Sequence, residues 1–173
     1  MAMDLKEVDN LVLIIGKTEG HIDQSLFART ILDEKNGPPP EVNLFNEKNN
    51  GESILNLINK GYVKSAHDIS LGGLLVAISK MCINGNKGIK LKKSKSLMND
   101  IEYFFSEDQG RYVVEIDQKD WKEVSKILDK NSVHHEELGV IVEKEIIFNE
   151  KTKLTIDELK TYNKNWLKNY MGS

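Results

Sequence analysis

Apolar residues recur along the chain with helical spacing in some segments and in continuous or alternating runs in others. Helical spacing predicts five helices, and Thr155 and Glu158 have the spacing of a capping box at the start of the last one. The predicted helices cover 25–32, 47–60, 74–82, 121–128 and 155–167. All three prolines lie together at 38–40, where they exclude a helix and favour an extended crossing segment.

Extended apolar runs separate these helices. The run at 11–15 is closed by Gly16 and is typical of a strand buried on both faces. Further strands are predicted at 62–66, 89–91, 112–116, 133–142 and 144–148. Because strands alternate with helices, we expect residues 1–173 to form one α/β domain with a mixed sheet flanked by helices.

A polar loop is predicted between two extended segments, the first of which covers 103–105. We expect this loop to expose four side chains together: Glu107, Asp108, Gln109 and Arg111. In a simpler interpretation, Glu107 and Arg111 only pair with each other at the surface, a contact that contributes little stability.

A glycine pair, Gly72 and Gly73, lies where a predicted strand turns into a predicted helix. His67, Asp68 and Ser70 stand at the mouth of this turn. Glycines allow the backbone to approach a ligand or another segment closely, and the first amides of a helix can receive an anion. Alternatively, Asp68 or Ser70 merely caps the helix, and the glycines only permit tight packing.

Composition and charge narrow the classes of function. A chain of 173 residues is long enough for a real core, and a formal net charge of −3 argues against a dedicated nucleic-acid binder. We interpret a group of lysines as a solvated face, because acidic residues follow it closely. These lysines are Lys87, Lys90, Lys92, Lys93 and Lys95.

The single cysteine and the absence of long apolar stretches indicate a cytoplasmic protein. Cys82 has no partner for an internal disulfide, and its place at the end of an apolar helical run predicts a buried side chain. No apolar stretch approaches the roughly 20 residues that span a bilayer. Charged residues stand near the N-terminus, where a signal peptide would be apolar. We therefore expect neither membrane nor nucleic acid as a partner.

The common catalytic motifs are absent from the sequence. It contains no phosphate loop, no dinucleotide-binding glycine motif, no nucleophile elbow and no zinc-binding helix motif. His134 and His135 would point to opposite faces of a strand and make a poor metal site. We also expect that His67 and Asp68, as neighbours, do not hydrogen-bond to each other as a base and its orienting carboxylate. No catalytic residue and no metal ligand is predicted within the chain.

Four segments stand in a characteristic order and at a characteristic spacing. They lie at 14–21, 39–44, 65–74 and 105–114. Together they resemble the carboxy-terminal domain of the synthetase subunit of phosphoribosylformylglycinamidine synthase, in the aminoimidazole ribonucleotide synthetase superfamily. The resemblance covers nearly the whole chain and implies a three-layer α/β fold.

The resemblance implies a role in purine biosynthesis. Such subunits make formylglycinamidine ribonucleotide from formylglycinamide ribonucleotide, ATP and ammonia, which a glutaminase subunit delivers. ATP activates the amide oxygen as a phosphorylated imidate, which ammonia displaces. The family's catalytic histidine and main Mg²⁺ ligands lie in its amino-terminal domains. The resemblance therefore implies that this chain is the last quarter of a longer subunit, packs against those domains, binds no cofactor alone and is inactive alone. A homodimer is also possible.

The resemblance further implies a substrate or nucleotide cleft. Residues 107–109 match a polar loop that touches the substrate in the first half of the family's subunit. In the second half, the same place faces a pseudo-symmetric site that holds a structural nucleotide in some members. Residues 67–74 match the family's glycine turn, but Leu71 stands where Asp is usual, and Asp23 replaces a glycine elsewhere. Leu71 weakens the case for cation or phosphate chemistry at the turn, and Asp23 argues against the close approach of a ligand to its own segment.

Two other hypotheses stay open at this point. The chain could be a stand-alone, non-catalytic module that binds a nucleotide, a phosphate or a protein partner. It could also be a sister enzyme of the superfamily, such as a hydrogenase-maturation protein or a thiamine-phosphate kinase. The loop at 106–111 fits the purine enzyme better than such a sister enzyme.

Overall fold

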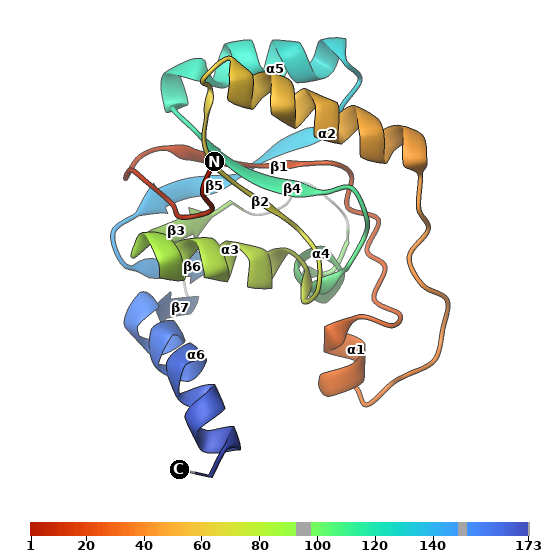
Figure 1. The fold of residues 1–173 in the computed structure, drawn as a ribbon, viewed down its shortest axis with the longest axis vertical. Coiled ribbons are helices and arrows are strands. Elements are labelled where there is room, and N and C mark those ends of the chain that lie inside the picture. Colours follow the sequence, from red (N-terminus) through yellow and green to blue (C-terminus); the bar gives the residue numbers. More distant parts are fainter. Residues whose placement is uncertain (93–97, 149–151, 173) are drawn as a thin grey trace.

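The described residues form three layers around a mixed β-sheet (Figure 1). The computed structural model describes residues 1–92, 98–148 and 152–172. Its strands are β1 (Leu11–Ile15), β2 (Val63–Asp68), β3 (Gly88–Leu91), β4 (Tyr112–Ile116), β5 (His135–Val142), β6 (Glu145–Phe148) and β7 (Thr152–Thr155). Its helices are α1 (Leu26–Thr30), α2 (Leu44–Asn59), α3 (Gly73–Gly85), α4 (Asp100–Phe105), α5 (Trp121–Lys130) and α6 (Ile156–Tyr170), with a short 3₁₀ turn at Gln118–Asp120.

The strands lie in the order β2-β4-β1-β5-β3-β6-β7. Neighbouring strands are antiparallel, except that β3 and β6 run parallel. Helices α2 and α5 cover one face, while α3, α4 and the start of α6 lie on the other. The predicted α/β class, the mixed sheet and its flanking helices are therefore confirmed.

Strand β1 shows why the sheet has two cores. Successive side chains of a strand point to opposite faces, so Leu11, Leu13 and Ile15 pack with α2 and α5. Val12 and Ile14 pack on the other face with α3. All five residues are buried, as the continuous apolar run predicted.

The extended segment expected at 103–105 is wrong, because these residues end helix α4. The side chain of Asn99 caps this helix by accepting a hydrogen bond from the backbone N–H of Glu102. Tyr103 is buried in the core beside α3, and its hydroxyl lies 2.9 Å from a carboxylate oxygen of Glu136. Consecutive aromatic residues resemble a strand, but the local cap and tertiary burial favour a helix here.

Other boundaries differ by a few residues, and one strand was missed. Helix α2 begins before the predicted position because the Asn43 side chain accepts from the N–H of Asn46, 3.0 Å away. Strand β7 was not predicted. The capping box at the start of α6 is confirmed, since Thr155 and Glu158 hydrogen-bond reciprocally between backbone and side chain.

Cys82 is fully buried, as predicted, and burial raises the pKa of its thiol to about 12. The thiol therefore stays protonated and unreactive at neutral pH.

Lys93 and Lys95 of the lysine group lie outside the described residues. Within the described ranges, no helix combines the length and the apolar character needed to cross a membrane.

Candidate functional site

Glu107 joins the start of α3 to the start of α1. One of its carboxylate oxygens accepts hydrogen bonds from the backbone N–H of Gly72, at 2.8 Å, and from that of Leu26, at 2.7 Å. A carboxylate is favourable at a helix N-terminus, where backbone amides lack helical partners. Glu107 therefore occupies the position that an external anion would take.

The expectation that the amides of the glycine pair are free to receive an anion is therefore wrong. The N–H of Gly73 also has a partner, the carbonyl oxygen of Ser70 at 2.9 Å. The alternative that Asp68 or Ser70 caps α3 is wrong too. Gly72 is the N-cap residue, and it has no side chain that could form a capping hydrogen bond. Glu107, which is 35 positions away in the sequence, instead binds the N–H of Gly72. The local sequence could not indicate this partner.

The glycine pair serves close packing between two segments of the chain. Both residues have positive φ angles, +88° at Gly72 and +72° at Gly73. A Cβ atom on Gly73 would lie 2.6 Å from the carbonyl oxygen of Ser106. The turn therefore approaches the end of α4 more closely than any other residue type allows.

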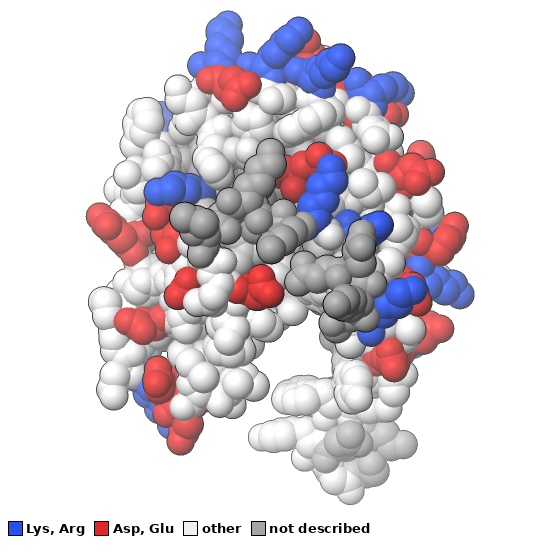
Figure 2. Space-filling view, turned by 180° about the vertical axis from the view of Figure 1, so that it is seen from behind, with Lys and Arg blue, Asp and Glu red and all other residues white. Residues whose placement is uncertain are grey.

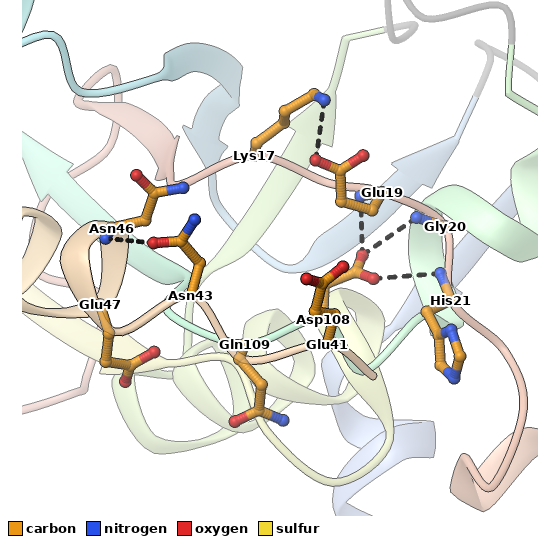
Figure 3. A pocket seen from close by; sticks show the side chains of 10 residues that line it. All are labelled: Lys17, Glu19, Gly20, His21, Glu41, Asn43, Asn46, Glu47, Asp108 and Gln109. Carbon is orange, nitrogen blue, oxygen red and sulfur yellow. Dashed lines mark hydrogen bonds and ion pairs between the residues drawn. The ribbon is translucent and has the colours of Figure 1, made fainter. Parts of the chain in front are cut away.

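Asp108 holds the loop after β1 in place. Its two carboxylate oxygens accept hydrogen bonds from three consecutive backbone amides, those of Glu19 at 2.9 Å, Gly20 at 3.0 Å and His21 at 3.1 Å (Figure 3). The side chain is almost completely buried. Such a set of amides is the arrangement that binds anions in many proteins, and here the anion is the protein's own carboxylate.

Arg111 is buried, so the expectation that the loop exposes it together with its neighbours is wrong. Its guanidinium donates to the carbonyl oxygens of Asp108 and Ser106 and to the Thr18 hydroxyl, at 2.7–3.1 Å. It lies 3.8 Å from the Asp108 carboxylate and does not pair with Glu107, contrary to the simpler interpretation. Burial lowers the pKa of Arg111, and the Asp108 charge opposes that shift.

His67 and Asp68 do hydrogen-bond, contrary to expectation. The Nδ1 atom of His67 lies 3.0 Å from a carboxylate oxygen of Asp68. Strand β2 ends at Asp68, and where strand geometry ends, neighbouring side chains can turn toward each other. Within the described residues, His67 Nε2 is buried without a hydrogen-bond partner.

A polar cavity of about 560 Å³ opens beside the Asp108 loop (Figure 3). Three segments far apart in the sequence line it: the loop after β1, the start of α2 and the 108–109 turn. The lining residues are Lys17, Glu19, Gly20, His21, Glu41, Asn43, Asn46, Glu47, Asp108 and Gln109.

Only part of the predicted cleft reaches this cavity. Asp108 and Gln109 line it, whereas the other predicted cleft residues do not: His67, Asp68, Ser70, Gly72, Gly73, Glu107 and Arg111. The lining residues that sequence reasoning missed come equally from 17–21 and from 41–47. Parts of both stretches lie in the segments that carry the family resemblance, but only the tertiary fold brings them beside the 108–109 turn.

The cavity is acidic and rich in side-chain amides. Four carboxylates line it against a single lysine, Lys17, which already lies 2.7 Å from Glu19. Excess negative charge disfavours a bare phosphate group. In the part of the chain that the structure describes, no three His, Cys, Asp or Glu side chains are grouped so as to hold a metal ion. The lining therefore suits a ligand that offers hydroxyl or amide groups.

Comparison with known proteins decides the family. Residues 7–149 match the family described as AIR synthase related protein, C-terminal domain. The chain belongs to this family. The resemblance found in the sequence is therefore confirmed.

Two relatives of the chain carry the same name. The chain is 63% identical over 171 residues to phosphoribosylformylglycinamidine synthase subunit PurL of Pelagibacter ubique. This match covers 99% of the chain and 23% of that relative. It is 35% identical over 161 residues to the subunit of the same name from Bartonella henselae, covering 93% of the chain and 22% of that relative. The chain thus spans less than a quarter of the length of these relatives.

Solved structures share the fold at low sequence identity. Thermotoga maritima PurL complexed with FGAR matches with a TM-score of 0.74 and 19% identity, over 92% of this chain and 29% of that one. Escherichia coli HypE, a hydrogenase maturation protein, matches with a TM-score of 0.64 and 15% identity, over 89% of this chain and 50% of that one. At such identities the likeness shows the fold alone.

Proposed function

We propose that this chain is the carboxy-terminal domain of the synthetase subunit of phosphoribosylformylglycinamidine synthase. The 63% identity over 99% of the chain to a subunit of that name carries the proposal. The parent subunit would act in the cytoplasm. It would convert formylglycinamide ribonucleotide, ATP and ammonia from a glutaminase subunit to formylglycinamidine ribonucleotide, ADP and phosphate. Since the chain spans 23% of that relative, we assign the reactive groups to the rest of the polypeptide.

Within the subunit, this domain would bind and position rather than catalyse. Carboxylates accept hydrogen bonds from hydroxyl groups, and side-chain amides both donate and accept. Glu47 and Gln109 face the cavity together with Asn43 (Figure 3). These groups suit the sugar of a ribonucleotide better than its phosphate. The described residues offer no cluster of metal ligands, so we assign ATP and Mg²⁺ to the amino-terminal domains.

The hypothesis of a stand-alone phosphate-binding module receives no support from the geometry. Glu107 already binds the N–H of Gly72 before α3, and Asp108 binds the amides of the loop after β1. The acidic lining of the cavity acts against it as well.

An activity assay tests the proposed function. The purified chain should produce no ADP from formylglycinamide ribonucleotide, ATP and an ammonium salt. The P. ubique subunit with its matched region replaced by this chain should be active, whereas the same subunit without that region should not. Turnover by the chain alone, or a folded chimera without activity, would contradict the proposal.

A substitution in the chimera tests the role of the cavity. We expect Glu47→Ala to raise KM for formylglycinamide ribonucleotide about tenfold with little change in kcat, because one charge-assisted hydrogen bond contributes about 1.5 kcal/mol or more. Glu52→Ala is the matched control, since Glu52 lies on the same helix, is exposed and does not line the cavity. Equal KM values for the two variants would remove Glu47 from the binding site.

A further inference from the structure

One face of α6 carries five large, largely apolar side chains with Asn163 among them, but only the first half of that face is covered. Ile156 is buried, and Leu159 packs against the core. Tyr162, Trp166 and Tyr170 continue the same face, yet they are 77%, 64% and 75% exposed. With 3.6 residues per turn, all five side chains fall within an arc of about 120°. We call the three exposed residues the aromatic stripe.

The aromatic stripe lies on a part of α6 that extends beyond the body of the domain (Figure 1). The rings of Trp166 and Tyr170 stack on each other with centroids 5.4 Å apart. From behind, Figure 2 shows the surface hollowed between the lobe formed by α6 and the lobe that carries α1. The α1 lobe also exposes apolar side chains, since Ile31 and Leu32 are 69% and 46% accessible.

Exposure on this scale is unusual, because only the first half of α6 packs against the domain, through Ile156 and Leu159. Aromatic side chains carry roughly 150–250 Å² each, so the stripe leaves roughly 400 Å² of largely apolar surface in water. A helical segment of about ten residues without tertiary contacts is only marginally stable in water. Both considerations indicate that another protein surface covers the stripe.

We propose that the aromatic stripe docks this domain onto the remaining part of its parent subunit, through an apolar groove there that receives the rings. The inference rests on the proposed function. The relatives support it, because the matched region makes up only 23% and 22% of their length. The rest of such a protein can supply the groove. A segment that enters the hollow beside α6 can also contact the α1 lobe, which enlarges the buried area.

A second copy of the chain fits the stripe less well. A symmetric contact between two stripes would bury roughly 800 Å² in total, below the roughly 1,200–2,000 Å² of stable specific interfaces. The docking proposal therefore commits to the parent polypeptide.

Hydrogen exchange measured by mass spectrometry tests the docking. In the chimeric P. ubique subunit, we expect the amides of 161–170 to exchange at least tenfold more slowly than in the isolated chain. The double variant Tyr162→Ala/Trp166→Ala should lose this protection. Lys164→Ala is the matched control, because Lys164 is exposed on the opposite side of the same helix, and it should keep the protection.

Two results would overturn the docking proposal. One is equal exchange in the chimera and the isolated chain. The other is protection in the isolated chain that rises with protein concentration together with a dimer in sedimentation, which would make a second copy the occupant. An active chimera with an unprotected α6 would refute the docking alone, whereas a protected α6 in an inactive chimera would support docking and count against the proposed function.

Discussion

At the scale of single residues, buried carboxylates tie distant segments together. Glu115 is the next-to-last residue of β4 and is fully buried. It accepts hydrogen bonds from the backbone N–H groups of Lys6 and Glu7, from the side-chain amide of Asn10 and from the Ser65 hydroxyl, at 2.7–3.2 Å. Four donors compensate the cost of removing the charge from water. Glu115 thereby anchors the N-terminal segment against the sheet.

Glu115→Ala should therefore destabilise the domain strongly. The substitution leaves several buried donors without an acceptor, and we expect the free energy of unfolding to fall by about 3 kcal/mol. Urea denaturation followed by circular dichroism measures the loss. Glu123→Ala on α5 is the control, because its side chain is exposed, and it should change stability by less than about 0.5 kcal/mol. A loss below about 1 kcal/mol for Glu115→Ala would show that the anchor contributes little.

At the scale of elements, the contact between the start of α3 and the end of α4 positions the cavity. Gly73 lies against the backbone of Phe105 and Ser106, directly before the two carboxylates of the loop. Glu107 then binds the α3 turn, and Asp108 binds the loop after β1. Each of these segments depends on the others for its position.

Gly73→Ala should disrupt this contact. The new Cβ would clash with backbone atoms at 2.6–2.8 Å, in addition to the strain of a φ angle of +72°. Gly61→Ala is a matched control, since Gly61 has a φ angle of +79° but open space around it. We expect a loss of about 1 kcal/mol for Gly61→Ala, from backbone strain alone, and at least about 2 kcal/mol more for Gly73→Ala. Thermal and urea denaturation compare the two, and equal losses would refute the packing role.

At the scale of the whole molecule, one sheet separates two hydrophobic cores. Leu57 of α2 is buried in the core on one face, and Ile78 of α3 in the core on the other. Both cores include residues of β1 and β4. Because the same strands bear both cores, we expect loss of either core to unfold the other.

Leu57→Ala and Ile78→Ala should therefore lower the stability of the same cooperative transition. Each substitution removes a fully buried side chain and should cost about 2–5 kcal/mol. In a Trp166→Phe background, tryptophan fluorescence reports on Trp121 of α5, and unfolding followed by this signal should coincide with unfolding followed by circular dichroism. Separate transitions for the two signals in either variant would indicate that the two layers unfold independently.

Local patterns in the sequence determined much of the secondary structure. The apolar run of β1, the burial of Cys82 and the capping box of Thr155 and Glu158 were all predicted, because each depends on residues a few positions apart. The order of four segments also indicated the family. Strand β7 was missed, and helix α4 was mistaken for a strand because three consecutive aromatic residues fit a strand as well as a helix.

Only the tertiary structure decided the partners of the polar residues. Glu107 binds Leu26 across 81 positions of sequence, and Asp108 binds Glu19 across 89. The cavity likewise joins the loop after β1 to the start of α2 and the 108–109 turn. Periodicity and capping act over a few residues, whereas a carboxylate can bind any donor that the fold brings within about 3 Å. The sequence by itself therefore determined most of the elements and the family, and the packing of those elements decided which polar groups are satisfied and which face the cavity.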